Sequence, residues 1–238
     1  MHFESSISLR KLAVTAGFSL VLMALLAGFG YGFAFPKIVI SGNPRATLEN
    51  LQQSEPLFRM VILAFVLILL LDVVVAWAFY FFFKPVDAAL SLLAAWLRIV
   101  YAALLGTALF PLAQVLPLLK QPGDNGPAML NSLQSFQTTW SLGLILFGFH
   151  LLGLGYLVMK SGRTVPRMLG WLAVLAALCY LFTNTANLVF PDYEAYKARV
   201  EGVLSLPMAL GELALAVWLL VKGGKRQPAV TTPSRSVA

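Results

Sequence analysis

Charged residues, histidine and cysteine are scarce in this sequence of 238 residues, and their scarcity narrows the class of protein. Charged residues make up 11% of the chain, whereas soluble domains carry roughly 25%. The chain has 59% hydrophobic residues and a mean hydropathy of +0.82. This is more apolar surface than a soluble globule can bury. A disordered chain is also excluded, because disordered chains contain far fewer hydrophobic residues. The single Cys179 cannot form an internal disulfide. The class of protein that fits this composition is a polytopic membrane protein.

The sequence also lacks the patterns of familiar enzymes and cofactor sites. It contains no GxSxG, Walker A, CxxC, GxGxxG or HExxH pattern, so we expect no cofactor and no metal ion. The 17 Lys and Arg against 10 Asp and Glu would suggest a nucleic-acid partner in a soluble protein. Here the basic residues flank apolar segments, where they anchor topology. We therefore expect the lipid bilayer, and not nucleic acid, as the partner.

Six apolar segments are each long enough for a membrane helix, which needs about 20 mostly apolar residues. They run over residues 12–35, 57–83, 86–110, 141–159, 168–190 and 206–221. The first is longer than the apolar core of a signal peptide, about 7–15 residues, so we interpret it as a retained span. The sequence predicts an all-α fold: one six-helix transmembrane domain over residues 1–222, then a disordered cytoplasmic tail over residues 223–238, which are rich in Gly, Pro, Ser and Thr.

The basic residues that flank these segments predict the orientation. The side with both termini carries ten Lys and Arg and two Asp and Glu, whereas the other side carries six of each. The positive-inside rule places the more basic side in the cytoplasm. We therefore predict that both termini are cytoplasmic.

Helix ends recur about every 75 residues along the sequence. The predicted outward spans end in Phe35-Pro36, Phe110-Pro111 and Phe190-Pro191, and the returning spans end with an aromatic residue four positions before a lysine: Tyr80 and Lys84, Tyr156 and Lys160, Trp218 and Lys222. One interpretation is three copies of a two-helix hairpin. The other is that aromatic belts, flanking lysines and prolines after helices are generic to membrane proteins.

Four ionisable residues lie near the middle of the predicted spans: Asp72, Arg98, His150 and Glu212. Counting at about 1.5 Å per residue places all four roughly 15–18 Å from the cytoplasmic helix ends. A charge at this depth costs at least about 2.5–3.5 kcal/mol, so the four should face inward and satisfy one another. We predict an Asp72–Arg98 pair, and a neutral Glu212 hydrogen-bonded to His150. The cluster either fixes helix register or binds a proton, an ion or a small ligand.

Two further polar or small-residue features stand out. Near the outer face, Thr183, Asn184 and Asn187 either line an outer vestibule or satisfy each other where the helix leaves the membrane. Gly153 and Gly155 match no phosphate-binding loop, and we predict that they permit close helix packing.

Several stretches together resemble a known family. They are Ser54–Arg59, Asp72–Val86, Leu93–Arg98, Phe149–Leu157, Pro166–Gly170, Gly211–Glu212 and Trp218–Gly223. In these stretches the chain resembles the bacterial integral membrane family catalogued as domain of unknown function 4386, over about residues 8–224. The resemblance implies a six-span protein of the bacterial inner membrane with no assigned activity.

Two classes of function fit the polar cluster. The first is a non-enzymatic protein that binds or moves a small solute or proton, or holds a lipid, within the bundle. The second is an intramembrane enzyme that uses His150 and a carboxylate as an acid–base pair on a lipid-soluble substrate. The second class needs a nucleophile or cofactor beside His150, and none is evident, so the sequence favours binding or transport. A purely structural role is a third reading.

Overall fold

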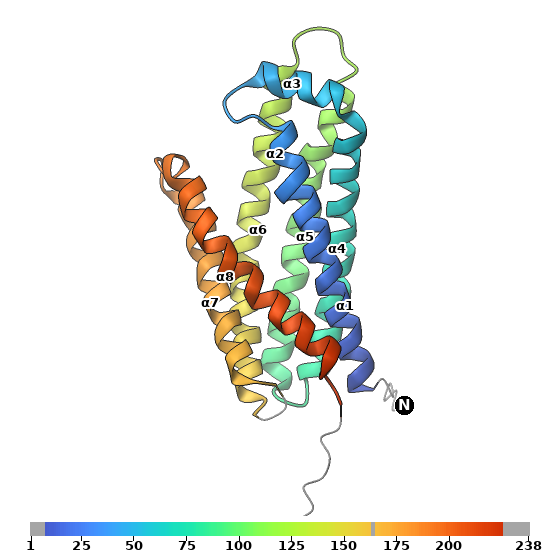
Figure 1. Ribbon diagram of the computed structural model, residues 1–238, viewed down its shortest axis with the longest axis vertical. Coiled ribbons are helices and arrows are strands. Elements are labelled where there is room, and N and C mark those ends of the chain that lie inside the picture. The colour runs from blue at the N-terminus through green and yellow to red at the C-terminus, as the bar shows by residue number, and fades with distance from the viewer. Residues whose placement is uncertain (1–7, 163–164, 226–238) are drawn as a thin grey trace, which may run out of the picture.

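The computed structural model of the protein describes residues 8–162 and 165–225. All regular elements in these residues are helical, and six of the helical segments are long and apolar enough to cross a membrane (Figure 1). This confirms the predicted fold class. The elements are α1 (Leu9–Ala27), η1 (Gly28–Ala34), α2 (Phe35–Ile38), α3 (Pro44–Gln53), α4 (Glu55–Phe83), α5 (Ala88–Leu118), α6 (Gly126–Lys160), α7 (Arg167–Val189) and α8 (Glu194–Val221). Most of the predicted tail, residues 226–238, lies outside the described part.

The first span is a composite of α1, the π-helical turn η1 and α2. The short helix α3 follows it and lies across the far end of the bundle from the N-terminus (Figure 1). Asn43 caps α3 by accepting a hydrogen bond from the Ala46 N–H at 3.0 Å, and Pro44 stands at the first helical position, where its missing N–H is not needed. The Asn43-Pro44 pair therefore fixes where this polar helix begins.

Three spans extend further than their apolar segments predict. Helix α5 continues through Pro111 to Leu118, α6 begins at Gly126, and α8 begins at Glu194. A hydropathy pattern marks only the lipid-embedded part of a helix, and polar turns of the same helix project beyond it. The polar segment Pro127–Thr139 is thus not a separate helix but the first part of α6.

This extension also corrects the assumed role of the Phe-Pro dipeptides. Helix α5 runs through Phe110-Pro111, and α2 runs through Phe35-Pro36 to Ile38. Only Phe190-Pro191 follows the end of a span. A proline removes one backbone hydrogen bond, which a well-packed membrane helix tolerates. The three dipeptides therefore do not mark equivalent helix ends, and the threefold repeat stays a prediction.

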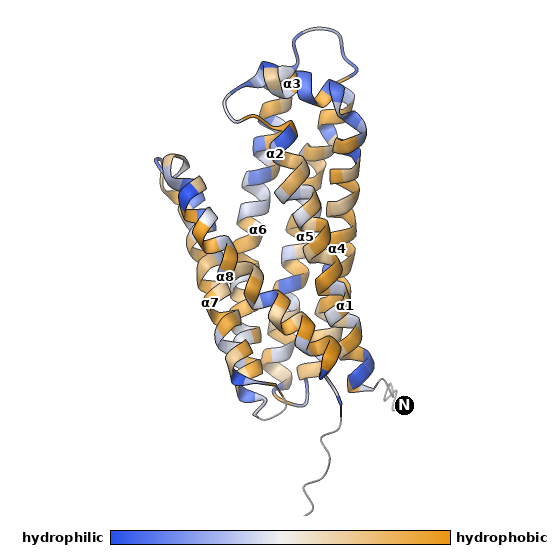
Figure 2. Ribbon diagram, in the orientation of Figure 1, coloured by the Kyte–Doolittle hydropathy of each residue, from blue (hydrophilic) through white to orange (hydrophobic). Residues whose placement is uncertain are grey.

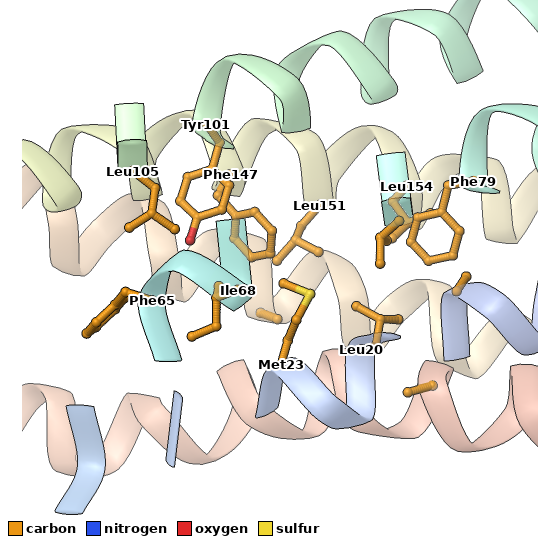
Figure 3. Packing of buried hydrophobic residues seen from close by; sticks show 14 of the residues in the cluster. Leu20, Met23, Phe65, Ile68, Phe79, Tyr101, Leu105, Phe147, Leu151 and Leu154 are labelled. Carbon is orange, nitrogen blue, oxygen red and sulfur yellow. The ribbon is translucent and has the colours of Figure 1, made fainter. Parts of the chain in front are cut away.

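The spans form a closed ring in which each packs against its two neighbours, in the order α1, α4, α5, α6, α7 and α8. Helix α6 packs against α5 and α7, and α1 packs against α4 and α8. Helix α8 runs diagonally from its place beside α7 to the start of α1 (Figure 1). Apolar residues cover the spans, and hydrophilic residues gather at the ends with a few near the middle (Figure 2). In the core, Leu20 and Met23 of α1 lie opposite side chains such as Ile68 and Leu151 (Figure 3).

Glycines let neighbouring helices approach closely in this bundle. A Cβ atom added at Gly155 of α6 would lie 2.9 Å from the backbone oxygen of Gly170 in α7, and one added at Gly170 would lie 2.8 Å from that of Gly155. The predicted packing role is thus confirmed for Gly155. At Gly153 an added Cβ would meet Ala94 at an ordinary 3.5 Å, so that glycine is not required for close approach.

Arg10 closes the junction between the first and last spans. Its Nη1 donates to the carbonyl oxygens of Leu219 at 3.0 Å and Gly223 at 2.9 Å, and Nη2 donates to that of Leu220. The carbonyls of Leu219 and Leu220 belong to the last turn of α8, and that of Gly223 follows it. The last carbonyls of a helix lack regular intrahelical donors, although Leu219 also accepts from the Gly223 N–H at 3.2 Å. A cation there also interacts favourably with the helix dipole. The basic residue that was expected to anchor topology therefore also caps α8.

Candidate functional site

The centre of the bundle holds a buried ion pair between α4 and α5. The side chains of Asp72 and Arg98 have no solvent exposure, and Oδ1 of Asp72 lies 2.7 Å from Nη2 of Arg98. The two helices are consecutive and joined by a short turn, so residues at matching depth on facing sides meet. The structure brings the two together as their depths predicted.

His150 of α6 extends this pair on the other side of the guanidinium. Its Nε2 lies 3.1 Å from Nη1 of Arg98, and its Nδ1 lies 2.8 Å from the backbone oxygen of Ala94. A guanidinium has no acceptor and a carbonyl has no proton to donate. The Nδ1–H therefore donates to Ala94, and Nε2 accepts from Arg98. Both contacts are satisfied together only by the neutral imidazole.

This arrangement corrects the expected hydrogen bond between His150 and Glu212. Both nitrogens of His150 are used by Arg98 and Ala94. Glu212 of α8 instead accepts a hydrogen bond from the hydroxyl of Tyr180 in α7, at 3.2 Å from Oε1. Glu212 as a whole residue is half-buried in the bundle. The helices that carry His150 and Glu212 both contact α7, and α7 supplies the partner of Glu212.

A small cavity joins Arg98 to Glu212. Its volume is about 10 Å³, and both side chains line it. The rest of its wall is mostly apolar: Leu20, Phe79, Leu151, Leu154, Ala173, Gly211 and Leu215. A cavity of roughly this size holds about one water molecule. We call the four residues Asp72, Arg98, His150 and Glu212 the mid-membrane polar cluster.

Some buried polar atoms of the Asp72–Arg98 pair lack a hydrogen-bond partner within the described residues. The guanidinium lies 5.1 Å from the centre of the Phe147 ring, and Nη2 lies 3.9 Å from the sulfur of Met23. Among the residues that the structure describes, Nε of Arg98 and Oδ2 of Asp72 have no hydrogen-bond partner. Buried polar atoms are nearly always bonded to protein or to water. Arg98 also lines the cavity, which has room for such a water.

Tyr180 is the member of this region that the sequence prediction missed. It lies 13 residues after Arg167, where α7 begins, which is about 20 Å along the helix at ~1.5 Å per residue. That depth is close to that of the polar cluster. A tyrosine inside a membrane span needs a partner for its hydroxyl, and this signal could have drawn attention to it.

The predicted outer polar group forms bonds between α6 and α7. Asn184 accepts a hydrogen bond from the Ser141 hydroxyl at 2.9 Å and donates to the backbone oxygen of Tyr180 at 2.8 Å. Asn187 donates to Ser141 at 3.3 Å, and Thr183 donates to the backbone oxygen of Cys179 at 2.9 Å. The geometry fits the interpretation in which these side chains satisfy one another.

Metal ligands do not cluster in the described residues. No three His, Cys, Asp or Glu side chains in that part of the chain are grouped so that they could hold a metal ion. Asp72 and His150 contact different nitrogens of the Arg98 guanidinium, and Glu212 accepts from Tyr180 instead.

Comparisons with known proteins extend the description to related chains. A family model described as "Domain of unknown function (DUF4386)" matches residues 15–223, a range that includes the whole polar cluster. An "Uncharacterized protein" of Archaeoglobus fulgidus is 35% identical to the chain over 167 residues, which cover 70% of this chain and 86% of that protein. No solved structure matches the chain.

Proposed function

Since the chain belongs to the DUF4386 family of unknown function, we propose that it is a membrane protein that binds and moves a proton at Glu212. The observation that carries this proposal is the cavity of about 10 Å³ lined by both Arg98 and Glu212. A space for about one water molecule suits a proton carried on water. It is too small for an organic solute or a lipid, so of the predicted ligands the proton fits best.

The charges of the cluster support Glu212 as the proton-binding group. Arg98 is already paired with Asp72 at 2.7 Å, and the His150 imidazole is neutral in the observed hydrogen bonds. A charged Glu212 would add a net charge at mid-membrane, which costs at least about 2.5–3.5 kcal/mol. A protonated Glu212 avoids this cost, and Arg98 across the cavity stabilises the carboxylate when the proton leaves.

The same hydrogen bonds weaken the enzymatic alternative. A general acid–base pair needs a ring nitrogen of His150 that can reach a substrate. Both nitrogens are bonded to Arg98 and Ala94, and none of the described residues that line the cavity is Ser, Thr or Cys. The other alternative is that the polar cluster only fixes the register of the helices. It can be told from proton transfer by measuring whether the protein conducts protons.

Replacing Glu212 with glutamine tests the proposal directly. In liposomes with an imposed membrane potential and an internal pH-sensitive dye, the wild-type protein should acidify or alkalinise the lumen faster than empty liposomes. Glu212→Gln should slow this flux by about 10²-fold, the low end of the contribution of a positioned acid–base group, because a carboxamide cannot exchange a proton.

The matched control is Glu55→Gln, which removes a carboxylate that is paired with Arg59 at the helix surface. Glu55→Gln should leave the flux unchanged, and Glu212→Asp should retain part of it. If the wild type and a folded Glu212→Gln variant give equal proton flux, proton transfer at Glu212 is refuted and the structural role is favoured.

We also propose that the protein lies in the bacterial inner membrane with both termini in the cytoplasm. Spans that are helical suit an inner membrane, since outer-membrane proteins are β-barrels. The ten-to-six bias of basic residues supports the orientation. Three of the six candidate spans precede α6 and all six precede Lys222.

Reporter fusions test this topology. Alkaline phosphatase fused after Gly126 should be active outside the cytoplasm, whereas the same enzyme fused after Lys222 should be inactive. A green fluorescent reporter should give the opposite pattern. Activity at both positions would contradict the six-span arrangement, and an exchanged pattern would invert the orientation.

A further inference from the structure

A second and larger cavity lies at the end of the bundle where α1 begins, away from the polar cluster. Its volume is about 420 Å³, within the range of roughly 300–1,000 Å³ typical of small-molecule sites. Its lining residues come from the ends of α4 and α6, the connections that follow them, the start of α1 and the residue Gly224 beyond α8. The start of α1 and the end of α8 lie side by side at this end of the bundle (Figure 1). We call this cavity, lined by Leu9, Phe82, Val86, Lys160 and Val165 among others, the basal pocket.

Among the described residues that line the basal pocket, all but Lys160 and Ser161 are hydrophobic residues, proline or glycine. Leu9, Phe82, Val86 and Val165 come from separate parts of the chain, and the charged group is Lys160. The hydroxyl of Ser161, which also lines the pocket, donates to the backbone oxygen of Val158 at 2.6 Å. Lys160 is therefore the polar group that can orient a ligand.

The Lys160 ammonium has donors to spare. Its Nζ lies 2.7 Å from Oδ2 of Asp87, and the side chain of Lys160 remains 45% exposed. An ammonium has three protons to donate, so two remain for another acceptor. The other oxygen of Asp87 accepts from the Leu90 N–H at 3.0 Å and caps α5. The Leu90 N–H and the Lys160 ammonium hold the pKa of Asp87 below its usual range, so Asp87 stays an anion that competes for Lys160.

The position of the basal pocket further limits the class of ligand that it can bind. It lies at the ends of membrane spans, on the side where ten basic residues face two acidic ones. A ligand there can keep an alkyl chain against apolar side chains while its anionic head stays at the membrane surface. The volume suits one chain rather than two.

We propose that the basal pocket binds a single-chain anionic amphiphile, a long-chain fatty carboxylate. The alkyl chain packs against Phe82, Val86 and Val165, and the carboxylate binds the Lys160 ammonium. Asp87 limits the affinity because it competes for the same ammonium. This site is independent of proton transfer at Glu212.

Oleate, its methyl ester and phosphatidylglycerol are the probes that test this site. The full-length protein in a neutral detergent is titrated with each, and native mass spectrometry counts the bound molecules. One oleate should bind per chain. Lys160→Gln should weaken oleate binding by about fivefold, the loss expected for one partly exposed ion pair, and should leave methyl oleate binding unchanged.

Asp87→Asn is the decisive variant because it predicts a gain. Asparagine keeps an oxygen that can cap α5 but frees Lys160, so oleate should bind a few-fold more tightly. Lys120→Gln, which alters an exposed lysine near the opposite end, should have no effect, and Glu212→Gln should bind oleate like wild type. Absence of saturable oleate binding, equal effects of Lys160→Gln and Lys120→Gln, or displacement of oleate by phosphatidylglycerol would overturn the proposal.

Discussion

Asp72→Asn is expected to destabilise the protein by about 3–5 kcal/mol, the typical cost of stranding one charge of a buried pair. In the described part of the chain the variant leaves the Arg98 guanidinium with no anion within salt-bridge distance, because its remaining contacts are the neutral His150, the Met23 sulfur and the Phe147 ring. Glu212 lies across the cavity and forms no salt bridge with it. A guanidinium cannot lose its proton in a protein. The charge therefore stays, and the site must admit water or distort.

Arg98→Gln should cost less than Asp72→Asn, although both break the same ion pair. The remaining Asp72 carboxylate can take up a proton and become neutral, which a guanidinium cannot match. The double variant Asp72→Asn with Arg98→Gln leaves no charge at the pair and should be more stable than Asp72→Asn alone. The coupling free energy between the two sites should thus be large and favourable.

Thermal or denaturant unfolding in detergent or nanodiscs measures these differences through a double-mutant cycle. The surface pair Glu55–Arg59 is the matched control, since its side chains are 35% and 50% exposed at a distance of 2.6 Å. Neutralising that pair should cost only about 0.3–0.5 kcal/mol. If the double variant at Asp72 and Arg98 is destabilised by the sum of the single variants, the pair is not coupled.

The depth of each polar residue along its helix was predictable from the sequence, and this is why the Asp72–Arg98 pair could be anticipated. Counting at about 1.5 Å per residue gives a depth without any knowledge of packing. For two consecutive helices joined by a short turn, equal depth is almost sufficient for contact. The six spans were predictable for a similar reason, since a bilayer of fixed thickness demands long apolar runs.

The partners of His150 and Glu212 were not predictable in this way. Helix α6 packs mainly on α5 and α7, whereas α8 packs on α7 and α1. Equal depth therefore does not bring the two residues together, because it says nothing about how each helix is rotated or which helix is its neighbour. The backbone oxygen of Ala94, which binds His150, has no side-chain signature at all. Helix ends were missed where polar turns continue a span beyond the lipid, as at the start of α6.

Close packing between α6 and α7 makes the protein sensitive to a substitution at Gly155, and this is the second large effect on stability that we expect. Gly155→Ala should destabilise the protein by about 1–3 kcal/mol, the usual cost of overpacking. The added Cβ would lie 2.7 Å from the Val174 side chain and 2.9 Å from the backbone oxygen of Gly170. The side chain could turn away, but the backbone oxygen can move only if α7 shifts.

Gly153→Ala provides the matched control on the same helix, two residues away. Its Cβ would meet the Ala94 Cβ at 3.5 Å, so no neighbour has to move, and alanine is the better helix former by about 0.8–1 kcal/mol. Gly153→Ala should therefore be neutral or slightly stabilising when thermal unfolding is measured beside Gly155→Ala. The outer contacts from Ser141 to Asn184 and Asn187 hold α6 and α7 together elsewhere, so Gly155→Ala should lower the unfolding temperature without preventing folding. Equal unfolding temperatures for the two variants would show that α6 and α7 lie further apart at Gly155 than the structure indicates.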